Sequence, residues 1–155
     1  QQRCDKRNKD LTVWLATQID EQEHYPLYRQ YINTRHADGD MFPPNLTQFR
    51  DFISNFREYT KIIEIRYEGE LVAAGVVDIL DDGLSAIYTY YSTDQKHKHR
   101  SLGTFTVLSQ ATLAKEMNLS YLYLGYWIKD SPKMAYKSNY KPLEILKDRQ
   151  WTLLV

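Results

Sequence analysis

Residues 62–91 read IIEIRYEGELVAAGVVDILDDGLSAIYTYY, three apolar runs in which side chains recur with a period of two. The runs cover Ile62–Tyr67, Leu71–Leu80 and Leu84–Tyr91. The short polar sequences between them, EGE and DDG, contain glycine and are typical of tight turns. We therefore expect three antiparallel strands that are joined in sequence order as a meander.

A crossover unit is expected after the meander. Residues 102–117 place apolar side chains at mainly helical spacing, and Asn118 suits the left-handed turn that ends a helix. Residues 121–128 then alternate aromatic and aliphatic side chains, as a strand with two different faces does, with Gly125 as a bulge or a point of close backbone approach. A strand, a helix and a second strand in this order predict a βαβ crossover.

Two helices are expected before the meander. The first should have Pro26 in its first turn and end near His36, ahead of Gly39. The second should be capped by Thr47 and bury a stripe of aromatic and aliphatic side chains. One or two short strands within residues 143–154 would close the chain. This order predicts an α+β protein with the N-acetyltransferase-like (GNAT) fold, in which a mostly antiparallel central sheet carries flanking helices and one βαβ unit.

The composition indicates a soluble protein without disulfides. The 155 residues suit one core-forming domain and contain neither an apolar run of membrane-spanning length nor a secretory signal, so we expect a cytoplasmic location and no membrane partner. Cys4 is the single cysteine, which excludes an internal disulfide and cannot by itself form a structural metal site. The loop Asp38-Gly39-Asp40 is more typical of a solvated turn than of a metal site, and no metal is expected.

One cationic run could bind phosphate. The formal net charge of zero argues against strong overall attraction to nucleic acid, but local patches stay open. Residues 96–100 read KHKHR and lie between the aromatic run Tyr88–Tyr91 and the expected helix. Such a run is usually a solvated loop. The alternative is nucleic-acid contact, because phosphate contacts combined with base stacking hold single strands.

The loop before the helix departs from an acetyl-CoA site. In acetyl-CoA enzymes of the GNAT fold this loop reads Arg/Gln-x-x-Gly-x-Gly/Ala, and its backbone amides hold a pyrophosphate. Here residues 100–105 read RSLGTF, so Phe105 stands where the last small residue is required. We therefore expect no cofactor, and a helix N-terminus that is open to a single phosphate.

A second cationic cluster is expected after the last strand of the βαβ unit. A short helix with Pro132 at its first position would put Lys133, Tyr136 and Lys137 on one face. Two ammonium groups and a phenol can bind a phosphate or a carboxylate. The alternative is a solvated helix whose tyrosine packs on the core.

Residues 124–142 read LGYWIKDSPKMAYKSNYKP. This run resembles the signature segment of bacterial aminoacyl-tRNA-protein transferases of the aspartate/glutamate leucyltransferase type, which are related to the arginyl-tRNA-protein transferases. Four shorter segments extend the resemblance across about residues 25–147: HADGDM at 36–41, VDIL at 77–80, GLSAIY at 83–88 and RSLGT at 100–104.

The resemblance implies an enzyme whose partners are aminoacyl-tRNA and proteins with N-terminal Asp or Glu. It would transfer an amino acid from the tRNA to the N-terminal amino group of the protein, which marks that protein for degradation by the N-degron route. The segments LGYWIK and MAYK favour leucine as the amino acid. An arginyl-tRNA-protein transferase with the same mechanism is the alternative.

The resemblance also divides the chain. Residues 25–155 are expected to form an acetyltransferase-like aminoacyl-transfer domain. Residues 1–24 are expected to be a basic lead-in helix, the remnant of a missing cysteine-containing N-terminal region.

Asp78 is the expected catalytic carboxylate, because it interrupts an otherwise apolar strand and could accept the proton of the attacking amine or hold that amine. The alternative is an exposed strand position or an ion pair with a lysine. Position in the family pattern adds Tyr88 and Tyr126 to the catalytic set. It assigns the acidic N-terminus to Arg100, Lys133, Tyr136 and Lys137, and tRNA binding to Tyr90, Lys96, Lys98, Arg100, Ser101 and Gly103.

Two other classes of function compete with this one. A non-catalytic acyltransferase-like module could bind acidic N-termini or RNA without chemistry. An acetyl-CoA N-acetyltransferase is the other rival, and Phe105 argues against it.

Overall fold

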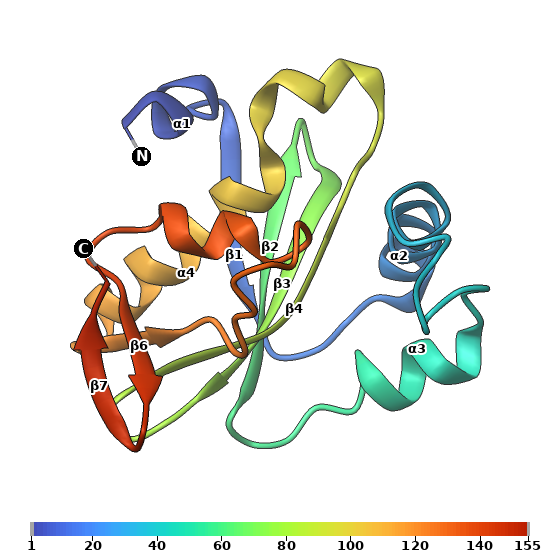
Figure 1. Cartoon of the computed structure of the whole chain (residues 1–155). Helices are drawn as coiled ribbons and strands as arrows, with labels where there is room; N and C mark the ends of the chain where they lie inside the picture. Colours follow the sequence, from blue (N-terminus) through green and yellow to red (C-terminus); the bar gives the residue numbers. More distant parts are fainter. Residues whose placement is uncertain (1, 155) are drawn as a thin grey trace. The chain divides into compact units, whose positions relative to one another are not determined.

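The structure is a computed structural model that describes residues 2–154. These residues form two compact units that divide between Tyr123 and Leu124 (Figure 1). The elements of the first unit are α1 (Gln2–Arg7), β1 (Leu11–Ala16), α2 (Glu21–Arg35), α3 (Leu46–Phe52), β2 (Thr60–Tyr67), β3 (Glu70–Ile79), β4 (Gly83–Tyr91), a 3-10 helix (Gln95–Arg100), α4 (Leu102–Glu116) and β5 (Tyr121–Tyr123).

A single sheet with the strand order β1-β2-β3-β4-β5 forms the centre of the first unit. Strands β1 to β4 pair antiparallel with their neighbours, and β5 pairs parallel with β4 after the crossover through α4. The expected meander and βαβ unit are therefore confirmed. Asn118 has a φ of 57° just after α4, which is the left-handed residue that the sequence predicts there.

Helices cover both faces of this sheet. Figure 1 shows α4 on one side of the strands and α2 with α3 on the other. On the α2/α3 face, Tyr28, Ile32 and Phe49 are fully buried against the sheet. On the α4 face, Leu102 is buried and Phe105 packs beside it. The two faces are thus separate hydrophobic layers that share one sheet.

The helices start at other residues than expected. Asp20 caps α2 by accepting a backbone N–H of the first turn, so the helix begins before Pro26, which lies in its second turn. The helix ends at the predicted place, with His36 as its C-cap. Asn45 rather than Thr47 caps α3, and its side chain accepts a backbone N–H at 2.8 Å.

The expected lead-in helix is wrong for residues 11–16. Residues 2–7 form the helix α1, but the run LTVWLA forms the strand β1, which pairs with β2 from Leu11↔Tyr67 to Ala16↔Ile62. The same six residues fit a period of two as well as helical spacing. Pairing with β2 decides between the two, because it satisfies the backbone hydrogen bonds along one edge of the strand.

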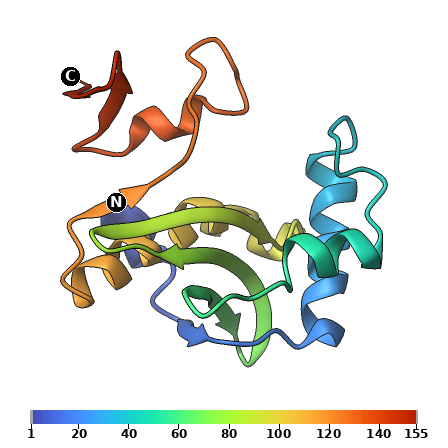
Figure 2. The ribbon, with the colours of Figure 1, turned by 90° about the horizontal axis from the view of Figure 1, so that it is seen from below.

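The second unit contains a 3-10 helix (Ala135–Asn139) and a hairpin of β6 (Glu144–Lys147) and β7 (Gln150–Leu153), drawn in orange to red in Figure 2. The hairpin confirms the expected closing strands. The strand expected over residues 121–128 ends at Tyr123, and Gly125 follows with a φ of 74°. The helix expected from Pro132 is the short 3-10 helix, which begins three residues later.

Candidate functional site

Two neighbouring strands separate within the first unit. β5 pairs with β4 only from Gly83↔Tyr121 to Ser85↔Tyr123, whereas β4 continues to Tyr91. From Ala86 onward the outer edge of β4 has no strand partner in the part of the chain that the structure describes. The register of β4 against β3 also shifts at this point, between Val76 and Val77. An unpaired edge with a bulge offers backbone N–H and C=O groups to a ligand.

Asp78 and Tyr88 lie on one face of the sheet near this separation. Asp78 pairs across the strands with Thr60 and with Ser85, and the Thr60 hydroxyl donates to its carboxylate at 2.6 Å. Directly paired residues share a face, so Val76 and its partner Tyr88 lie on the same side as Asp78, two residues along β3. Val76 belongs to the core beneath α2 and α3. The structure thus brings two of the predicted catalytic residues to the α2/α3 face.

Tyr88 is suited to donate a hydrogen bond. Its half-buried ring packs edge-on against Phe52 at 5.4 Å between centroids and lies 6.3 Å from the ring of Tyr28. This burial raises the pKa of Tyr88 well above its ordinary value of 10.0. The phenol therefore remains protonated at neutral pH.

The prediction that Tyr90 binds tRNA by stacking is wrong. Its side chain is 0% exposed beneath α2 and α3, so no base can reach the ring. Its hydroxyl instead lies 2.7 Å from Nδ1 of His24, whose Nε2 lies 3.1 Å from a carboxylate oxygen of Glu64. Because a carboxylate only accepts, Nε2 carries the proton and Nδ1 accepts the Tyr90 hydroxyl.

This buried network continues to the surface through Arg66. The guanidinium donates to Glu64 at 2.8 Å and to Glu23 at 2.6 Å. Burial lowers the pKa of His24, although Glu64 opposes that shift. The network was not predicted from the sequence, although a signal was present, since Glu64 interrupts the apolar run IIEIRY and a buried carboxylate needs partners.

Arg100 is not available for substrate or phosphate, contrary to the sequence prediction. It is 6% exposed, and its guanidinium makes two hydrogen bonds to Asp10, at 2.7 and 2.8 Å. The same group lies 4.6 Å over the ring of Tyr67. The side chain of Asn8 donates to the Arg100 carbonyl at 2.9 Å. The residues around β1 therefore hold Arg100 as a structural cation.

The other predicted tRNA residues lie around the start of α4. Lys96 and Lys98 are exposed, and Lys96 pairs with Glu70 at 3.1 Å. Ser101 is exposed and has a φ of 53°, and no side chain caps α4 there. At Gly103 an added Cβ would lie 2.9 Å from the ring of Tyr91, so this glycine makes room for a tyrosine of β4.

The second unit carries the remaining predicted residues. Nζ of Lys137 donates to the Tyr126 carbonyl at 2.6 Å, and burial lowers the pKa of Lys137. The Tyr126 side chain is 91% exposed. Tyr136 packs edge-on against Tyr140 at 6.4 Å between ring centroids, and Lys133 is exposed. Lys137 and the Tyr126 backbone therefore meet within this unit.

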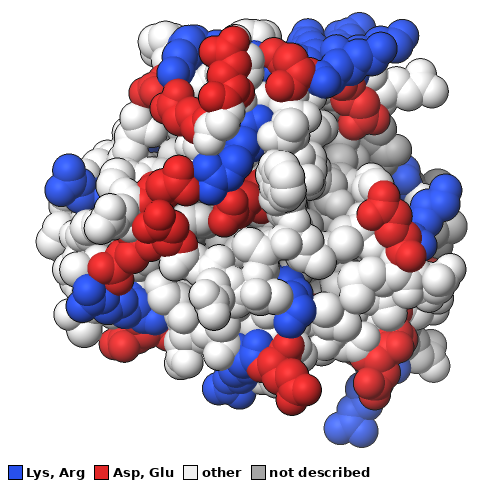
Figure 3. All heavy atoms as spheres, turned by 180° about the vertical axis from the view of Figure 1, so that it is seen from behind, with Lys and Arg blue, Asp and Glu red and all other residues white. Residues whose placement is uncertain are grey.

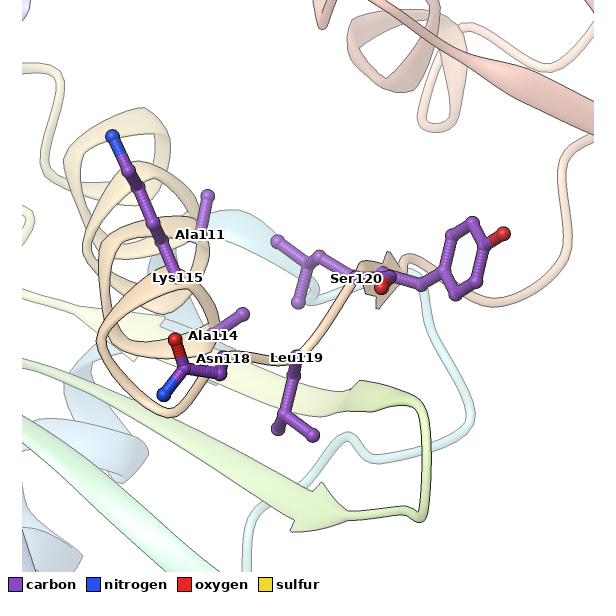
Figure 4. Close-up of a pocket in the computed structure, with 8 residues that line it drawn as sticks. Ala111, Ala114, Lys115, Asn118, Leu119 and Ser120 are labelled. Carbon is purple, nitrogen blue, oxygen red and sulfur yellow. The ribbon is translucent and has the colours of Figure 1, made fainter.

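Two hollows in the first unit contain none of the predicted site residues. One, of about 460 Å³, lies between the C-terminal half of α4 and β5 and is lined by Ala111, Lys115, Asn118 and Leu122, among others (Figure 4). The second, of about 350 Å³, lies between β1 and α4 and includes Phe105. Among residues 2–154, no group of three or more His, Cys, Asp or Glu side chains is arranged to hold a metal ion.

Figure 3 shows positive and negative side chains interspersed around uncharged areas on the face that it draws. No helix in the described part of the chain is long and apolar enough to cross a membrane.

The solved structures with similar folds include acetyltransferases. The ribosomal-protein-alanine N-acetyltransferase of Brucella melitensis aligns with a TM-score of 0.58 at 18% identity, covering 94% of this chain and 96% of that one. The ribosomal-protein-S18-alanine N-acetyltransferase of Escherichia coli aligns with a TM-score of 0.56 at 15% identity, covering 83% and 76%. At these identities the likeness shows the fold alone, and it confirms the predicted GNAT architecture.

Sequence relatives are much closer. An aspartate/glutamate leucyltransferase of Pseudomonas putida KT2440 is 48% identical over 154 residues, which is 99% of this chain and 65% of that protein. Proteins of the same name from Hahella chejuensis and Acinetobacter baumannii are 48% and 47% identical over 97% and 99% of this chain, and it covers 64% and 56% of them. The chain thus spans at most about two thirds of the length of these curated relatives.

The family described as "Arginine-tRNA-protein transferase, C terminus" matches residues 23–147. This match covers most of the chain and includes the strand separation, Asp78, Tyr88 and the start of α4. The chain belongs to this family of aminoacyl-tRNA-protein transferases.

Proposed function

We propose that this protein transfers an amino acid, with leucine favoured, from aminoacyl-tRNA to the N-terminal amino group of proteins that begin with Asp or Glu. The observation that carries the proposal is the 48% identity to an aspartate/glutamate leucyltransferase over 154 residues. The GNAT fold supports it, because this architecture serves acyl transfer in the acetyltransferases described above.

The reaction exchanges an ester for an amide. The nitrogen of the N-terminal amine attacks the ester carbonyl carbon, a C–N bond forms, and the C–O bond to the terminal ribose of the tRNA breaks. The amine loses a proton and the released ribose oxygen gains one, so atoms and charge balance. Because the ester is already activated, alignment of the reactants can supply about 7–11 kcal/mol of the barrier reduction.

The amine is proposed to approach from the α2/α3 face. Asp78 and Tyr88 lie on that face, next to the edge of β4 that β5 leaves open. Asp78 would orient the amine and accept its proton, and the protonated Tyr88 phenol would donate to the ester or to the released oxygen. The Thr60 hydroxyl holds the Asp78 carboxylate for this task.

The tRNA end is proposed to approach from the α4 face. Lys96, Lys98, Ser101 and Gly103 lie at or before the start of α4, where positive side chains and helix amides would bind phosphate. Arg100 and Tyr90 have no part in this proposal, because both are buried and hydrogen-bonded.

The carboxylate of an N-terminal Asp or Glu is proposed to bind at the second unit. Lys137 is half-buried, and its ammonium makes a hydrogen bond to a backbone carbonyl at 2.6 Å. Partial burial strengthens the attraction between such a cation and a carboxylate. Lys133, Tyr136 and Tyr126 would complete the site. Transfer would mark the acceptor for degradation, and the proposed location is the cytoplasm, where charged tRNA is available.

Transfer of radiolabelled amino acids tests the proposal. Leucyl-tRNA and arginyl-tRNA would each be incubated with the protein and with peptides that begin with Asp, Glu or Ala. We expect label from leucyl-tRNA on the Asp and Glu peptides and none on the Ala peptide. Label only from arginyl-tRNA would overturn the choice of leucine. Absence of label from every pair would support a non-catalytic module instead.

A further inference from the structure

A row of polar side chains crosses four strands of the first unit. The register pairs Thr60 with Asp78, Asp78 with Ser85, and Ser85 with Tyr123. Directly paired residues share a face, so the row lies on the α2/α3 face of the sheet. The pair of Ser85 and Tyr123 is also the last one between β4 and β5. The row therefore ends where the edge of β4 opens.

The hydroxyl of Ser85 is available to a ligand. The side chain is half-buried and so remains partly exposed, and its hydroxyl makes no hydrogen bond to another side chain among residues 2–154. Its neighbours in the row are engaged, since Thr60 donates to Asp78 at 2.6 Å and Tyr123 donates to Asp82 at 2.9 Å. A hydroxyl can accept one hydrogen bond while it donates another. Ser85 can therefore pass a proton between two groups that contact it.

The spacing of Asp78 and Ser85 suits the transfer reaction. Residues directly opposite in an antiparallel pair have Cβ atoms about 4.5–5.5 Å apart. The attacking nitrogen and the leaving oxygen are bonded to one carbon in the tetrahedral intermediate, so the groups that take and give the proton must stand close together. Ser85 lies one strand nearer to the open edge than Asp78, and Thr60 holds the Asp78 carboxylate from the opposite side. A ribose that enters along the open edge would therefore reach Ser85 before Asp78.

We propose that the Ser85 hydroxyl carries a proton from Asp78 to the leaving oxygen of the terminal ribose of the tRNA. This inference rests on the proposed transfer reaction. The amine nitrogen attacks the ester carbon, a C–N bond forms, and the Asp78 carboxylate takes a proton from that nitrogen. As the C–O bond to the ribose breaks, Ser85 gives its proton to the ribose oxygen and takes the proton of Asp78.

The relay returns both side chains to their starting forms. Asp78 is again a carboxylate and Ser85 is again a hydroxyl, so atoms and charge balance without a further reactant. Proton transfer to a leaving group in this way is general acid catalysis. The relay leaves the Tyr88 phenol to donate to the ester carbonyl oxygen, which gains negative charge during attack.

Removal of the hydroxyl tests the proposal. The variants are Ser85→Ala, which lacks the hydroxyl, and Ser85→Thr, which keeps it and suits a strand. The matched control is Ser109→Ala, because Ser109 is also half-buried and its hydroxyl donates at 2.9 Å within its own helix. The single-turnover rate of leucine transfer from leucyl-tRNA to an Asp-initiated peptide, the Kd of uncharged tRNA and the Tm are measured for the wild type and for all three variants.

We expect Ser85→Ala to lower the transfer rate by about 100-fold. The Kd of uncharged tRNA should stay within about twofold and the Tm should not change, because the relay acts only in the transition state. Ser85→Thr should keep the rate within about 10-fold of the wild type, and Ser109→Ala should keep it within about twofold.

A better leaving group separates a proton relay from a structural role. The second donor is leucyl-tRNA with a 2′-fluoro group on its terminal ribose, acylated chemically at the 3′ oxygen. Fluorine lowers the pKa of the 3′ hydroxyl, so the leaving oxygen needs less help from an acid. With this donor the loss in Ser85→Ala should shrink to under about 10-fold.

An equal loss in Ser85→Ala with both donors would overturn the inference. So would a loss that comes with a lower Tm and weaker tRNA binding and that Ser85→Thr does not restore, which is the signature of a structural role. If the wild type transfers leucine and Ser85→Ala transfers it equally well, this inference alone fails. If the wild type transfers nothing from either donor, the proposed function fails and the inference fails with it.

Discussion

Two buried tyrosines of the α2/α3 face form a matched pair for mutation. Tyr90 and Tyr28 are both 0% exposed, and their rings lie edge-on at 5.8 Å between centroids. They differ in their hydroxyls. The Tyr90 hydroxyl donates to Nδ1 of His24 at 2.7 Å, whereas the Tyr28 hydroxyl has no hydrogen-bond partner among the described residues. Replacing each by phenylalanine keeps the ring and removes only the oxygen.

The two substitutions should have opposite effects on the free energy of unfolding. Tyr90→Phe leaves Nδ1 of His24 as a buried acceptor without a donor, which costs about 1–3 kcal/mol. For a chain of this size, a loss of about 2 kcal/mol lowers the Tm by about 4–8 °C. Tyr28→Phe removes a buried hydroxyl that has no bond to lose, so we expect no destabilisation and a gain of up to about 1 kcal/mol.

Urea unfolding at pH 7.5, followed by circular dichroism, measures the difference. The prediction is a lower midpoint for Tyr90→Phe and an equal or higher midpoint for Tyr28→Phe, with equal m-values for both. Equal destabilisation by the two substitutions would show that the hydrogen bond to His24 is not what distinguishes them. If Tyr90→Phe leaves the urea midpoint unchanged, the hydrogen-bond network of Tyr90, His24 and Glu64 does not contribute measurably to stability.

Three further results are expected. Burial lowers the pKa of His24 and His97 below 6.5, so the unfolded chain binds more protons than the folded one just below that pH. The urea midpoint should therefore be constant above pH 6.5 and fall as the pH drops below it. A midpoint that rises on acidification would contradict this. Asp78→Asn should lower the rate of leucine transfer by about 100-fold or more with the Kd for tRNA unchanged; an equal rate would exclude Asp78 as the base. Gly83→Ala should cost about 1–3 kcal/mol in urea unfolding, because a Cβ there would lie 2.7 Å from a β5 backbone oxygen, whereas Gly39→Ala, with a nearest contact of 3.4 Å, should cost under about 1 kcal/mol.

The sheet and the crossover could be predicted because residues 62–91 form three apolar runs separated by turn sequences, and because residues 102–117 have mainly helical spacing. Local sequence does not settle β1, since LTVWLA fits a helix and a strand equally well. The choice depends on pairing with β2, which lies about fifty residues further along the chain. Long-range pairing of this kind leaves no mark in a local pattern.

Some residues of the candidate site could likewise be predicted from the local sequence, and others could not. The sequence predicts that the Asp78 carboxylate needs a partner, and the Thr60 hydroxyl donates to it, while its catalytic role stays a prediction. Arg100 could not be assigned, because Asp10, which occupies its guanidinium, is 90 positions away. Tyr88 and Tyr90 occupy one face of one strand, and only the helices packed over them leave one half-exposed and the other buried.

In the proposed reaction, leucine becomes joined to the α-amino group of an acidic N-terminus. The most direct measurement is tandem mass spectrometry of an Asp-initiated peptide after incubation with the protein and leucyl-tRNA, beside the same peptide with its N-terminus acetylated. We expect one added leucine, located before the Asp, on the free peptide and no addition to the acetylated one. Addition to the acetylated peptide, or leucine located elsewhere in the free peptide, would contradict it.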